Sequence, residues 1–298
     1  MSIGEIIPGQ YIGGYRVLRL LGQGNSSEVY LGEYPGLDQP VAVKLLHAWT
    51  GERDIQRFLT QAAMLSKLDH PNIIHIYDFG LTDADVPYLV MSYMPYGTLR
   101  QRYPRGTRLP LGEVVPYTSQ IADALQYVHE HQIVHRDVKP QNMLLTEQNQ
   151  IILNDFGTAT VSYSLVPNVV DFEGTVLYAA PEQLEGCSLR SSDQYALGVM
   201  VHELLTGSWP FIGTFEEVTY KHLSASPPTL REKGIIVSLQ VEEALQRALS
   251  KDPASRFATI QDFADALVET PLFEDLLSQL QAPLPASKKQ FRSPLPFS

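Results

Sequence analysis

Residues 135–142 read His-Arg-Asp-Val-Lys-Pro-Gln-Asn, and residues 155–157 read Asp-Phe-Gly. Two short strand-like runs, NMLLT and IILND, lie around them. These stretches hold two carboxylates, one lysine and one carboxamide: Asp137, Asp155, Lys139 and Asn142. Carboxylate and amide oxygens are the ligands that Mg²⁺ prefers, and a lysine balances negative charge. The pattern therefore predicts a site that holds a divalent cation beside an anionic group.

Two stretches nearer the N-terminus extend this pattern. Residues 21–29 read Leu-Gly-Gln-Gly-Asn-Ser-Ser-Glu-Val, in which glycines would let backbone N–H groups approach a phosphate. The turn lies between strand-like runs, which argues against a dinucleotide-binding turn, because a helix would follow that turn. Further on, Val41-Ala42-Val43-Lys44 places a lysine on an apolar strand. That lysine either extends to water at a sheet edge or points toward the phosphates below the glycine loop.

The three stretches occur in one order along the chain. Together they supply a carboxylate to orient a hydroxyl nucleophile, oxygen ligands for Mg²⁺, and cations that meet developing phosphate charge. A chance match to all three is negligible. The sequence therefore predicts phosphoryl transfer.

The remaining pattern divides the chain into two lobes. Residues 11–50 resemble a meander of short strands, and residues 52–68 carry apolar side chains at helical spacing. Beyond a Pro- and Gly-marked break near residue 96, long helical runs dominate. We expect an α+β, bilobal molecule whose small lobe is an antiparallel sheet with one main helix and whose large lobe is mostly helical. The predicted boundaries are an extension (1–10), a small lobe (11–91), a hinge (92–95), a large lobe (96–270) and a tail (271–298).

Composition narrows the functional classes. The net charge of −11 disfavours nucleic acid, because an acidic surface repels phosphate backbones. One cysteine, Cys187, excludes an intrachain disulfide and fits a reducing compartment. The N-terminus lacks the pattern of a secretory leader, and no apolar run approaches the ~20 residues that span a bilayer. We therefore expect a cytoplasmic location and no membrane span.

The motifs resemble those of Hanks-type serine/threonine protein kinases of the bacterial style, from about residue 11 to residue 270. The resemblance implies transfer of the ATP γ-phosphate to Ser or Thr hydroxyls of protein substrates. It implies that Lys44 pairs the α- and β-phosphates, Asp137 orients the substrate hydroxyl and Lys139 steadies the γ-phosphate. By the same resemblance Asn142 and Asp155 hold Mg²⁺, for which Mn²⁺ could substitute.

Further residues take roles only through this resemblance. The nucleotide would contact the following set: Leu21, Gly22, Gly24, Val29, Ala42, Lys44, Ser92, Met94 and Leu144. Met91 would be the gatekeeper, and Ser92 and Met94 would offer backbone groups to adenine. Scaffold roles follow for Asp193, which would tie the catalytic loop to a central helix, and for a pair between Glu182 and Arg256. Residues 158–164 would form an autophosphorylated activation loop, and a homodimer acting in trans remains open.

The chain departs from the family pattern at two positions. Ser27 replaces the third glycine of the loop, with a modest expected effect. Gln61 stands where the family has a glutamate that pairs with the strand lysine, and it could hydrogen-bond Lys44 without neutralising it. The sequence thus keeps a second hypothesis, a pseudokinase that binds nucleotide as a scaffold or switch. A third, a small-molecule kinase on the same fold, is disfavoured by Gly174-Thr175 and Ala180-Pro181-Glu182, which suit a protein substrate.

Overall fold

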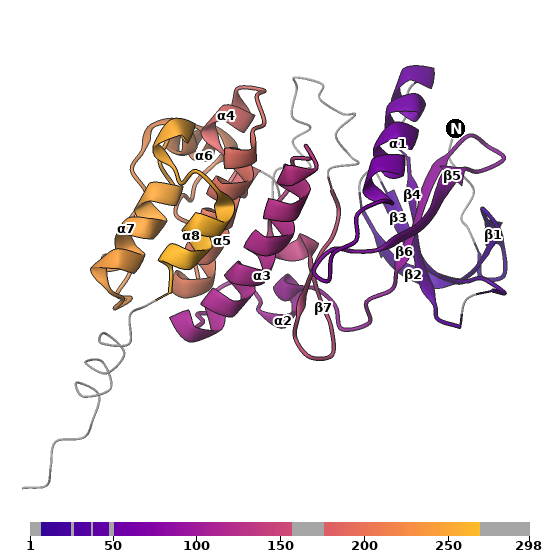
Figure 1. The fold of residues 1–298 in the computed structure, drawn as a ribbon, viewed down its shortest axis with the longest axis horizontal. Coiled ribbons are helices and arrows are strands. Elements are labelled where there is room, and N and C mark those ends of the chain that lie inside the picture. The colour runs from indigo at the N-terminus through magenta and orange to yellow at the C-terminus, as the bar shows by residue number, and fades with distance from the viewer. Residues whose placement is uncertain (1–6, 25–26, 37, 48–50, 157–175, 269–298) are drawn as a thin grey trace, which may run out of the picture.

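Strands gather at one end of the molecule and helices at the other (Figure 1). The computed structural model describes residues 7–24, 27–36, 38–47, 51–156 and 176–268. The strand-rich end is formed by the first part of the chain and the helical end by the second part (Figure 1). The predicted α+β, bilobal fold is therefore confirmed.

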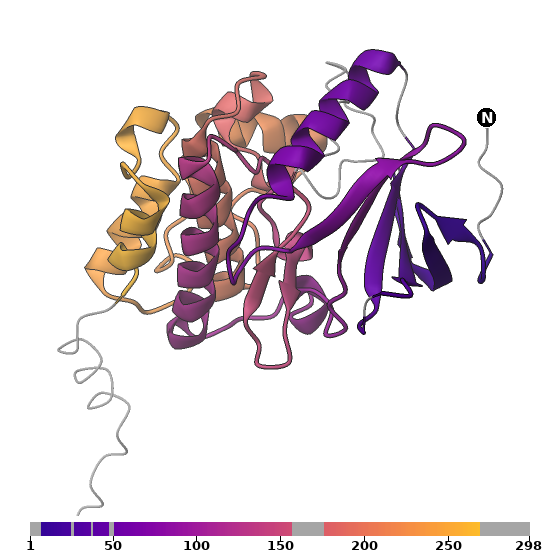
Figure 2. The ribbon, with the colours of Figure 1, turned by 45° about the vertical axis from the view of Figure 1, so that its right-hand side comes forward.

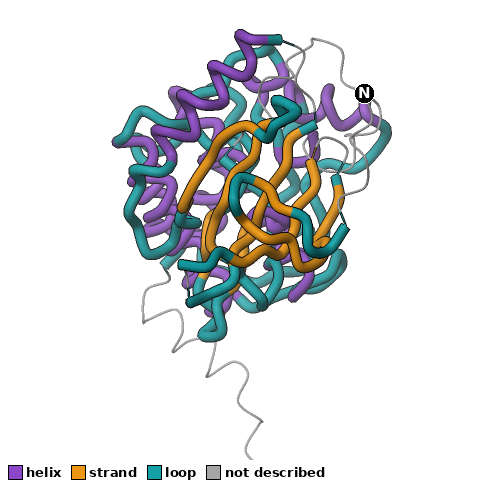
Figure 3. The backbone as a smooth tube through the Cα atoms, turned by 90° about the vertical axis from the view of Figure 1, so that its right-hand side faces the viewer, coloured by secondary structure: helices purple, strands orange, loops and turns teal. Residues whose placement is uncertain are grey.

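The small lobe is one antiparallel sheet of order β1-β2-β3-β4-β6-β5. Seen from outside this lobe, the strands lie in front of the helices (Figure 3). The register between β2 and β3 shifts twice, as at β-bulges, which bend a strand. The strands are β1 (Tyr11–Ile12), β2 (Tyr15–Gln23), β3 (Ser27–Glu33), β4 (Val41–Leu46), β5 (Ile76–Leu81) and β6 (Pro87–Ser92).

Strand β4 is buried along its whole length, and its two faces serve different cores. Val41, Val43 and Leu45 pack in a small cluster on one face of the sheet. Ala42 and Leu46 belong to the main core, which continues into the large lobe. Because side chains alternate along a strand, Lys44 shares the face of Ala42 and Leu46. Strand parity thus directs this lysine toward the junction of the lobes.

Helix α1 (Glu52–Leu65) packs against β5 and β6 through a stripe of apolar residues. Phe58, Ala62 and Leu65 are buried, at the three- and four-residue spacing of one helix face. Gln61 lies three residues after Phe58 and four before Leu65, so it belongs to the same face. The helix is slightly shorter than the 52–68 segment expected from the sequence.

The large lobe is assembled around α5 (Arg190–Thr206). Every residue from Ser192 to Thr206 is buried, because α3, α7 and α8 surround this helix. Gly207 ends it in the left-handed conformation, φ 76°. The other helices are α2 (Leu99–Arg102), α3 (Leu111–Glu130), α4 (Pro181–Leu184), α6 (Phe215–Ser224), α7 (Leu239–Ala248) and α8 (Ile260–Ala266), with 3-10 turns at Pro140–Asn142, Val176–Tyr178 and Pro253–Ser255.

A short hairpin, β7 (Met143–Leu145) with β8 (Ile151–Leu153), lies at the junction of the lobes (Figure 2). Its backbone is bonded to the segment that follows α1: Ile74 N donates to Leu153 O at 2.9 Å, and Leu153 N to Asn72 O at 2.8 Å. The hairpin therefore connects the catalytic segments of the large lobe to the small lobe.

Among the residues that the structure describes, no helix is long and apolar enough to cross a membrane.

Candidate active site

The loop before β7 is held by one buried carboxylate on the central helix. Asp193 of α5 accepts hydrogen bonds from the backbone N of His135 at 2.9 Å and of Arg136 at 2.8 Å. It also contacts Nε2 of His129 at 2.7 Å. Arg136 has a φ of 72°, a conformation that needs such external support. The predicted role of Asp193 in tying this loop to a central helix is confirmed.

His135 joins the loop to the residues before Asp155. Its Nδ1 accepts a hydrogen bond from the backbone N of Asp137 at 3.2 Å, so its Nε2 carries the proton that goes to Asn154 O at 3.1 Å. The ring also packs on Phe156, with centroids 4.8 Å apart. The histidine is thus a fixed bridge between the two motif stretches, and both of its nitrogens are used.

Asp137 is oriented by two neighbours from its own loop. Lys139 Nζ lies 2.8 Å from Asp137 Oδ2. Asn142 Nδ2 donates to the same oxygen at 2.8 Å and to the backbone O of Asp137 at 2.7 Å. Both contacts converge on Oδ2, so Oδ1 is the oxygen presented to an incoming hydroxyl. Asp137, Lys139 and Asn142, three of the five residues that the sequence selected for catalysis and metal binding, therefore lie together.

Lys44 and Asp155 meet across the junction of the lobes. Lys44 Nζ lies 2.8 Å from Asp155 Oδ1, although 111 residues separate them in the chain. Burial alone would raise the pKa of Asp155, but the Lys44 ammonium, with a smaller effect of Lys139, holds that pKa below its usual value. The carboxylate is therefore charged at neutral pH and able to bind a cation.

A small cavity of about 20 Å³ lies directly behind this ion pair. Its walls are mainly apolar: Leu65, Ile74, Ile76, Leu89, Met91 and Phe156, together with Lys44, Asn154 and Asp155. These apolar walls reduce solvent screening of the ion pair on the cavity side, while the Asp155 side chain remains 30% exposed. Met91, the expected gatekeeper, is buried at this wall.

Gln61 does not reach Lys44 in this structure, contrary to the contact considered from the sequence. Its Oε1 is buried and has no hydrogen-bond partner among the described residues. The physical reason is that an ammonium gains about twice as much from a charged carboxylate as from a neutral amide oxygen, and Asp155 is within reach. The acidic partner of Lys44 thus comes from the large lobe and not from α1.

The residues expected to contact a nucleotide surround the same junction. Gly22 pairs with Val29 across β2 and β3, and Gly24 N donates to Ser27 O at 2.8 Å, which closes the glycine turn. Ala42 lies opposite Met91 across β4 and β6. Partly buried apolar side chains pack against the main core beside them: Leu21, Val29, Met94 and Leu144.

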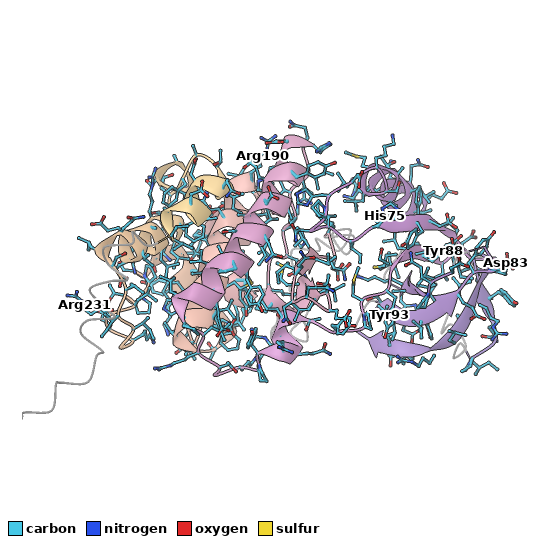
Figure 4. All side chains as sticks on the ribbon, turned by 60° about the horizontal axis from the view of Figure 1, so that its bottom comes forward. His75, Asp83, Tyr88, Tyr93, Arg190 and Arg231 are labelled. Atoms are coloured by element: carbon cyan, nitrogen blue, oxygen red, sulfur yellow. The ribbon has the colours of Figure 1, made fainter. Side chains whose placement is uncertain are left out.

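The last residue of β6 has only some of its backbone groups available for hydrogen bonds to a ligand. The N–H of Ser92 donates to His75 O at 2.9 Å, so Ser92 has only its carbonyl to offer to adenine. Figure 4 places His75 and Tyr93 on the side of the small lobe that faces the large lobe, with Asp83 at the far end. The hinge strand is thus anchored at the junction of the lobes.

Behind the site, α4 is fixed to the end of the domain by a buried ion pair. Arg256 Nη1 and Nη2 each donate to one oxygen of Glu182, at 2.7 and 2.9 Å, and Ser192 Oγ donates to Glu182 at 2.7 Å. Burial opposes ionisation, but the Arg256 contacts lower the pKa of Glu182. The pair expected from the sequence is confirmed. Gly157, residues 158–164, Gly174 and Thr175 lie outside the described residues.

The oxygen ligands and ammonium groups at this site fit Mg²⁺ and a nucleoside triphosphate. Asn142 spends its amide nitrogen on Asp137, an orientation that leaves its carboxamide oxygen as the metal-facing group. Asp155 is a charged oxygen ligand, and Lys44 and Lys139 are cations placed at either side for phosphate oxygens. Hard oxygen ligands of this kind suit Mg²⁺ and Mn²⁺.

Several bacterial proteins are similar to this chain in sequence. PrkC of Bacillus subtilis (strain 168), a serine/threonine-protein kinase by name, is 37% identical over 284 residues, which cover 94% of this chain and 43% of that protein. PknF of Mycobacterium tuberculosis (strain ATCC 25618 / H37Rv) is 38% identical, with 87% of this chain and 56% of that protein covered. Pkn1 of Myxococcus xanthus is 37% identical, with 86% and 38% covered. The chain thus spans between 38% and 56% of the length of these relatives.

The family model described as the protein kinase domain matches residues 15–273. This range contains the glycine turn, the Lys44 strand, the catalytic loop and the Glu182–Arg256 pair, whose geometry is given above. The chain belongs to the protein kinase domain family.

Proposed function

We propose that this chain is a serine/threonine protein kinase that transfers the γ-phosphate of ATP to protein hydroxyls, and that residues 11–270 form its catalytic domain. The observation that carries the proposal is the pair of clusters at the junction of the lobes. Asp137 with Lys139 and Asn142 stands on one side, and Lys44 with Asp155 on the other. The names of the similar bacterial kinases support the same activity.

In this mechanism Asp137 orients the nucleophile. Its Oδ1 accepts a hydrogen bond from the acceptor hydroxyl, while Lys139 and Asn142 hold Oδ2 in place. As the hydroxyl oxygen bonds to the γ-phosphorus, the bond to the bridging β–γ oxygen breaks and the hydroxyl proton passes to Asp137. Lys44 meets the α- and β-phosphates, and Lys139 meets the γ-phosphate.

Metal chemistry enters through Asn142 and Asp155. Bound Mg²⁺ would supply charge neutralisation of the phosphate oxygens. Asp155 is paired with Lys44 in this structure. When nucleotide and metal bind, Lys44 would also contact phosphate oxygens and Asp155 would also contact the metal. A position between a metal and a lysine is compatible with a carboxylate, because it has two oxygens that can each accept.

The alternative is a nucleotide-binding pseudokinase, and Gln61 is the observation that favours it. Its neutral side chain cannot form an ion pair with Lys44, and within the part of the chain that the structure describes its Oε1 has no hydrogen-bond partner. The intact Asp137, Asn142 and Asp155 favour an active enzyme, because a scaffold has no need of the oriented Asp137 carboxylate.

A phosphotransfer assay with labelled ATP and Mg²⁺ separates the two functions. The wild type should label acceptor proteins and Asp137→Asn should reduce turnover at least about a hundredfold, because general-base residues contribute that much. ATP affinity should stay within about twofold, since Asp137 acts on the hydroxyl. The exposed Asp83→Asn is the matched control. Labelling by Asp137→Asn within tenfold of wild type would remove Asp137 from this role, and no labelling by wild type would favour the pseudokinase.

A further inference from the structure

The base of the glycine turn is fastened by a polar cluster that takes no part in the mechanism above. Glu28, the second residue of β3, accepts a hydrogen bond from Gln23 Nε2 at 2.9 Å and another from Tyr30 OH at 2.8 Å. His47, which directly follows β4, places its Nε2 3.3 Å from Glu28 Oε2. The end of β2, the start of β3 and the end of β4 thus meet at one carboxylate.

This cluster lies on the face of the sheet that is turned away from the ammonium of Lys44. Across β3 and β4, Glu28 lies opposite Leu45, whereas Val29 lies opposite Lys44. Successive side chains of a strand point to opposite faces, and Leu45 and Tyr30 both belong to the small cluster on the Glu28 face. Glu28 therefore does not compete with phosphates for Lys44, and it acts on a bound nucleotide through the position of the backbone.

The glycine turn lies between two members of this cluster, Gln23 and Glu28. Inside the turn, Gly24 N donates to Ser27 O at 2.8 Å. Glycine loses more conformational freedom on ordering than any other residue, so fixing this turn around a nucleotide costs free energy. Contacts that order the base of the turn beforehand lower that cost and raise affinity.

His47 is the member of the cluster whose charge depends on pH. Imidazole is the side chain that gains a proton between pH 8 and pH 5, a range in which carboxylates are ordinarily ionised. Protonated His47 forms an ion pair with Glu28, and neutral His47 does not. The two side chains are 27% and 20% exposed, so the pair is partly shielded from solvent.

The groups that face this pair from the neighbouring strands titrate elsewhere. Tyr30 on β3 and Tyr88 on β6, opposite the last paired residue of β4, are phenols, which titrate at about pH 10. Burial raises the pKa of Tyr88 further. Gln23 of β2 is uncharged, and residues 48–50 after His47 have no ionisable side chain.

We propose that Glu28 is a positioning residue for the glycine turn and that His47 is its pH-dependent partner, so that the turn holds a nucleoside triphosphate more tightly when His47 is protonated. This inference rests on the proposed kinase function. The sign follows from linkage. The arrangement that binds the nucleotide better also binds the proton better, so affinity falls as the pH rises through the imidazole titration.

Calorimetric binding of a non-hydrolysable ATP analogue with Mg²⁺, at pH 6 and at pH 8, tests the proposal without turnover. His47→Arg carries a constant charge and should keep the tighter affinity at both values. Relative to this variant, the Kd of the wild type should rise about threefold from pH 6 to pH 8, the size of effect that a partly exposed ion pair produces. His47→Gln and Glu28→Gln should show the weaker affinity at both values.

The matched control is Glu33→Gln, which removes one charge of an ion pair at the other end of the same β2–β3 hairpin, where Arg16 Nε lies 2.9 Å from Glu33 Oε1. It should keep the wild-type pH dependence. In steady-state assays, KM for ATP should follow the Kd values, while kcat of His47→Gln stays within about twofold of wild type, because the cluster faces away from the reacting groups. Both His47 variants change a side chain beyond the last residue of β4, so the test does not depend on the folding of Glu28→Gln.

Each outcome decides the proposal. An equal pH dependence in all these proteins would show that the cluster is structural only, and so would a His47→Arg variant that loses affinity at pH 8 as the wild type does. If the wild type binds no nucleotide at either pH, the proposed function fails instead. Hydrogen exchange of the free protein then tests the positioning role. Relative to His47→Arg, the amides of Gln23 and Glu28 in the wild type should be about threefold more protected at pH 6 than at pH 8, and equal protection would overturn the proposal.

Discussion

At the residue scale, the contacts of Lys44 reflect the presence of a glutamine, Gln61, where the kinase family pattern has a glutamate. With a glutamine on α1, the lysine pairs with Asp155, which the mechanism also assigns to the metal. Gln61 Oε1 is buried without a hydrogen-bond partner among the described residues, a state that costs about 1–3 kcal/mol. Position 61 of α1 therefore supplies no charge that would draw the helix toward Lys44.

Gln61→Glu should raise the turnover of the unphosphorylated protein severalfold. A carboxylate at this position can pair with Lys44, which releases Asp155 for the metal and stabilises the active arrangement by about 1–2 kcal/mol. That difference corresponds to about a five- to thirtyfold change in population. Steady-state kcat and KM for ATP are the measurements.

The matched control is Gln56→Glu, which makes the same change on the exposed side of α1. It should leave turnover unchanged. If Gln61→Glu leaves activity equal or lower, α1 does not limit the active arrangement, and the Lys44–Asp155 pair is itself the working state.

At the element scale, the short helix α4 depends on a contact with the end of the domain. The Arg256 side chain is fully buried and Glu182 is 9% exposed, so their pair is nearly free of solvent screening. Ser192 of α5 adds a third contact. The position of α4 relative to α5 is thus defined by the buried contacts that Glu182 makes with Arg256 and Ser192.

Arg256→Ala should lower the free energy of unfolding by about 3–5 kcal/mol, because it leaves the Glu182 carboxylate buried without a cation. Urea unfolding followed by circular dichroism measures this. The exposed Arg190→Ala, which removes one bond to Gln132, should change stability by less than about 0.5 kcal/mol. Adding Glu182→Gln to Arg256→Ala should recover part of the loss. A loss below about 1 kcal/mol for Arg256→Ala would contradict the assignment.

At the scale of the whole molecule, two buried histidines link stability to pH. Burial lowers the pKa of His202 to about 4, against a weak opposing bond to Ser208 O. Burial and the Lys251 charge lower the pKa of His222 to about 3. Both histidines are fully buried, so the folded protein keeps them neutral where the unfolded chain binds protons. Their contribution is therefore complete above about pH 6.5 and is lost as the pH falls toward the folded pKa.

Between pH 7 and pH 5 the free energy of unfolding should fall by about 2 kcal/mol for each of these histidines, since the unfolded pKa is about 6.5. Urea titrations at the two pH values measure the difference. His202→Asn and His222→Asn should each remove about half of the pH dependence, and the exposed His131→Asn should not. Equal stability of the wild type at pH 5 and pH 7 would contradict this account.

The sequence alone determined the features that depend on local order. The 135–142 stretch brought Asp137, Lys139 and Asn142 together within one loop, whereas two orientations of Lys44 stayed open until the strand was seen in the sheet. The motifs also indicated the two lobes and the tie made by Asp193. The residues of one loop can be placed together from sequence because they are already within reach before the chain folds, whereas the Asp193 tie spans 58 residues and was implied only by the family resemblance.

Only the tertiary structure decided which charges pair over long distances. The choice of Asp155 over Gln61 as the partner of Lys44 spans 111 residues, and the Arg100–Glu203 pair spans 103. An ion pair depends on the distance and the solvent exposure of both groups, and neither can be read from residue order. The packing of α2, α5 and the Val176–Tyr178 turn sets the distances in the Arg100–Glu203 pair. The cluster of Arg100, Tyr178 and Glu203 therefore follows from the tertiary structure alone.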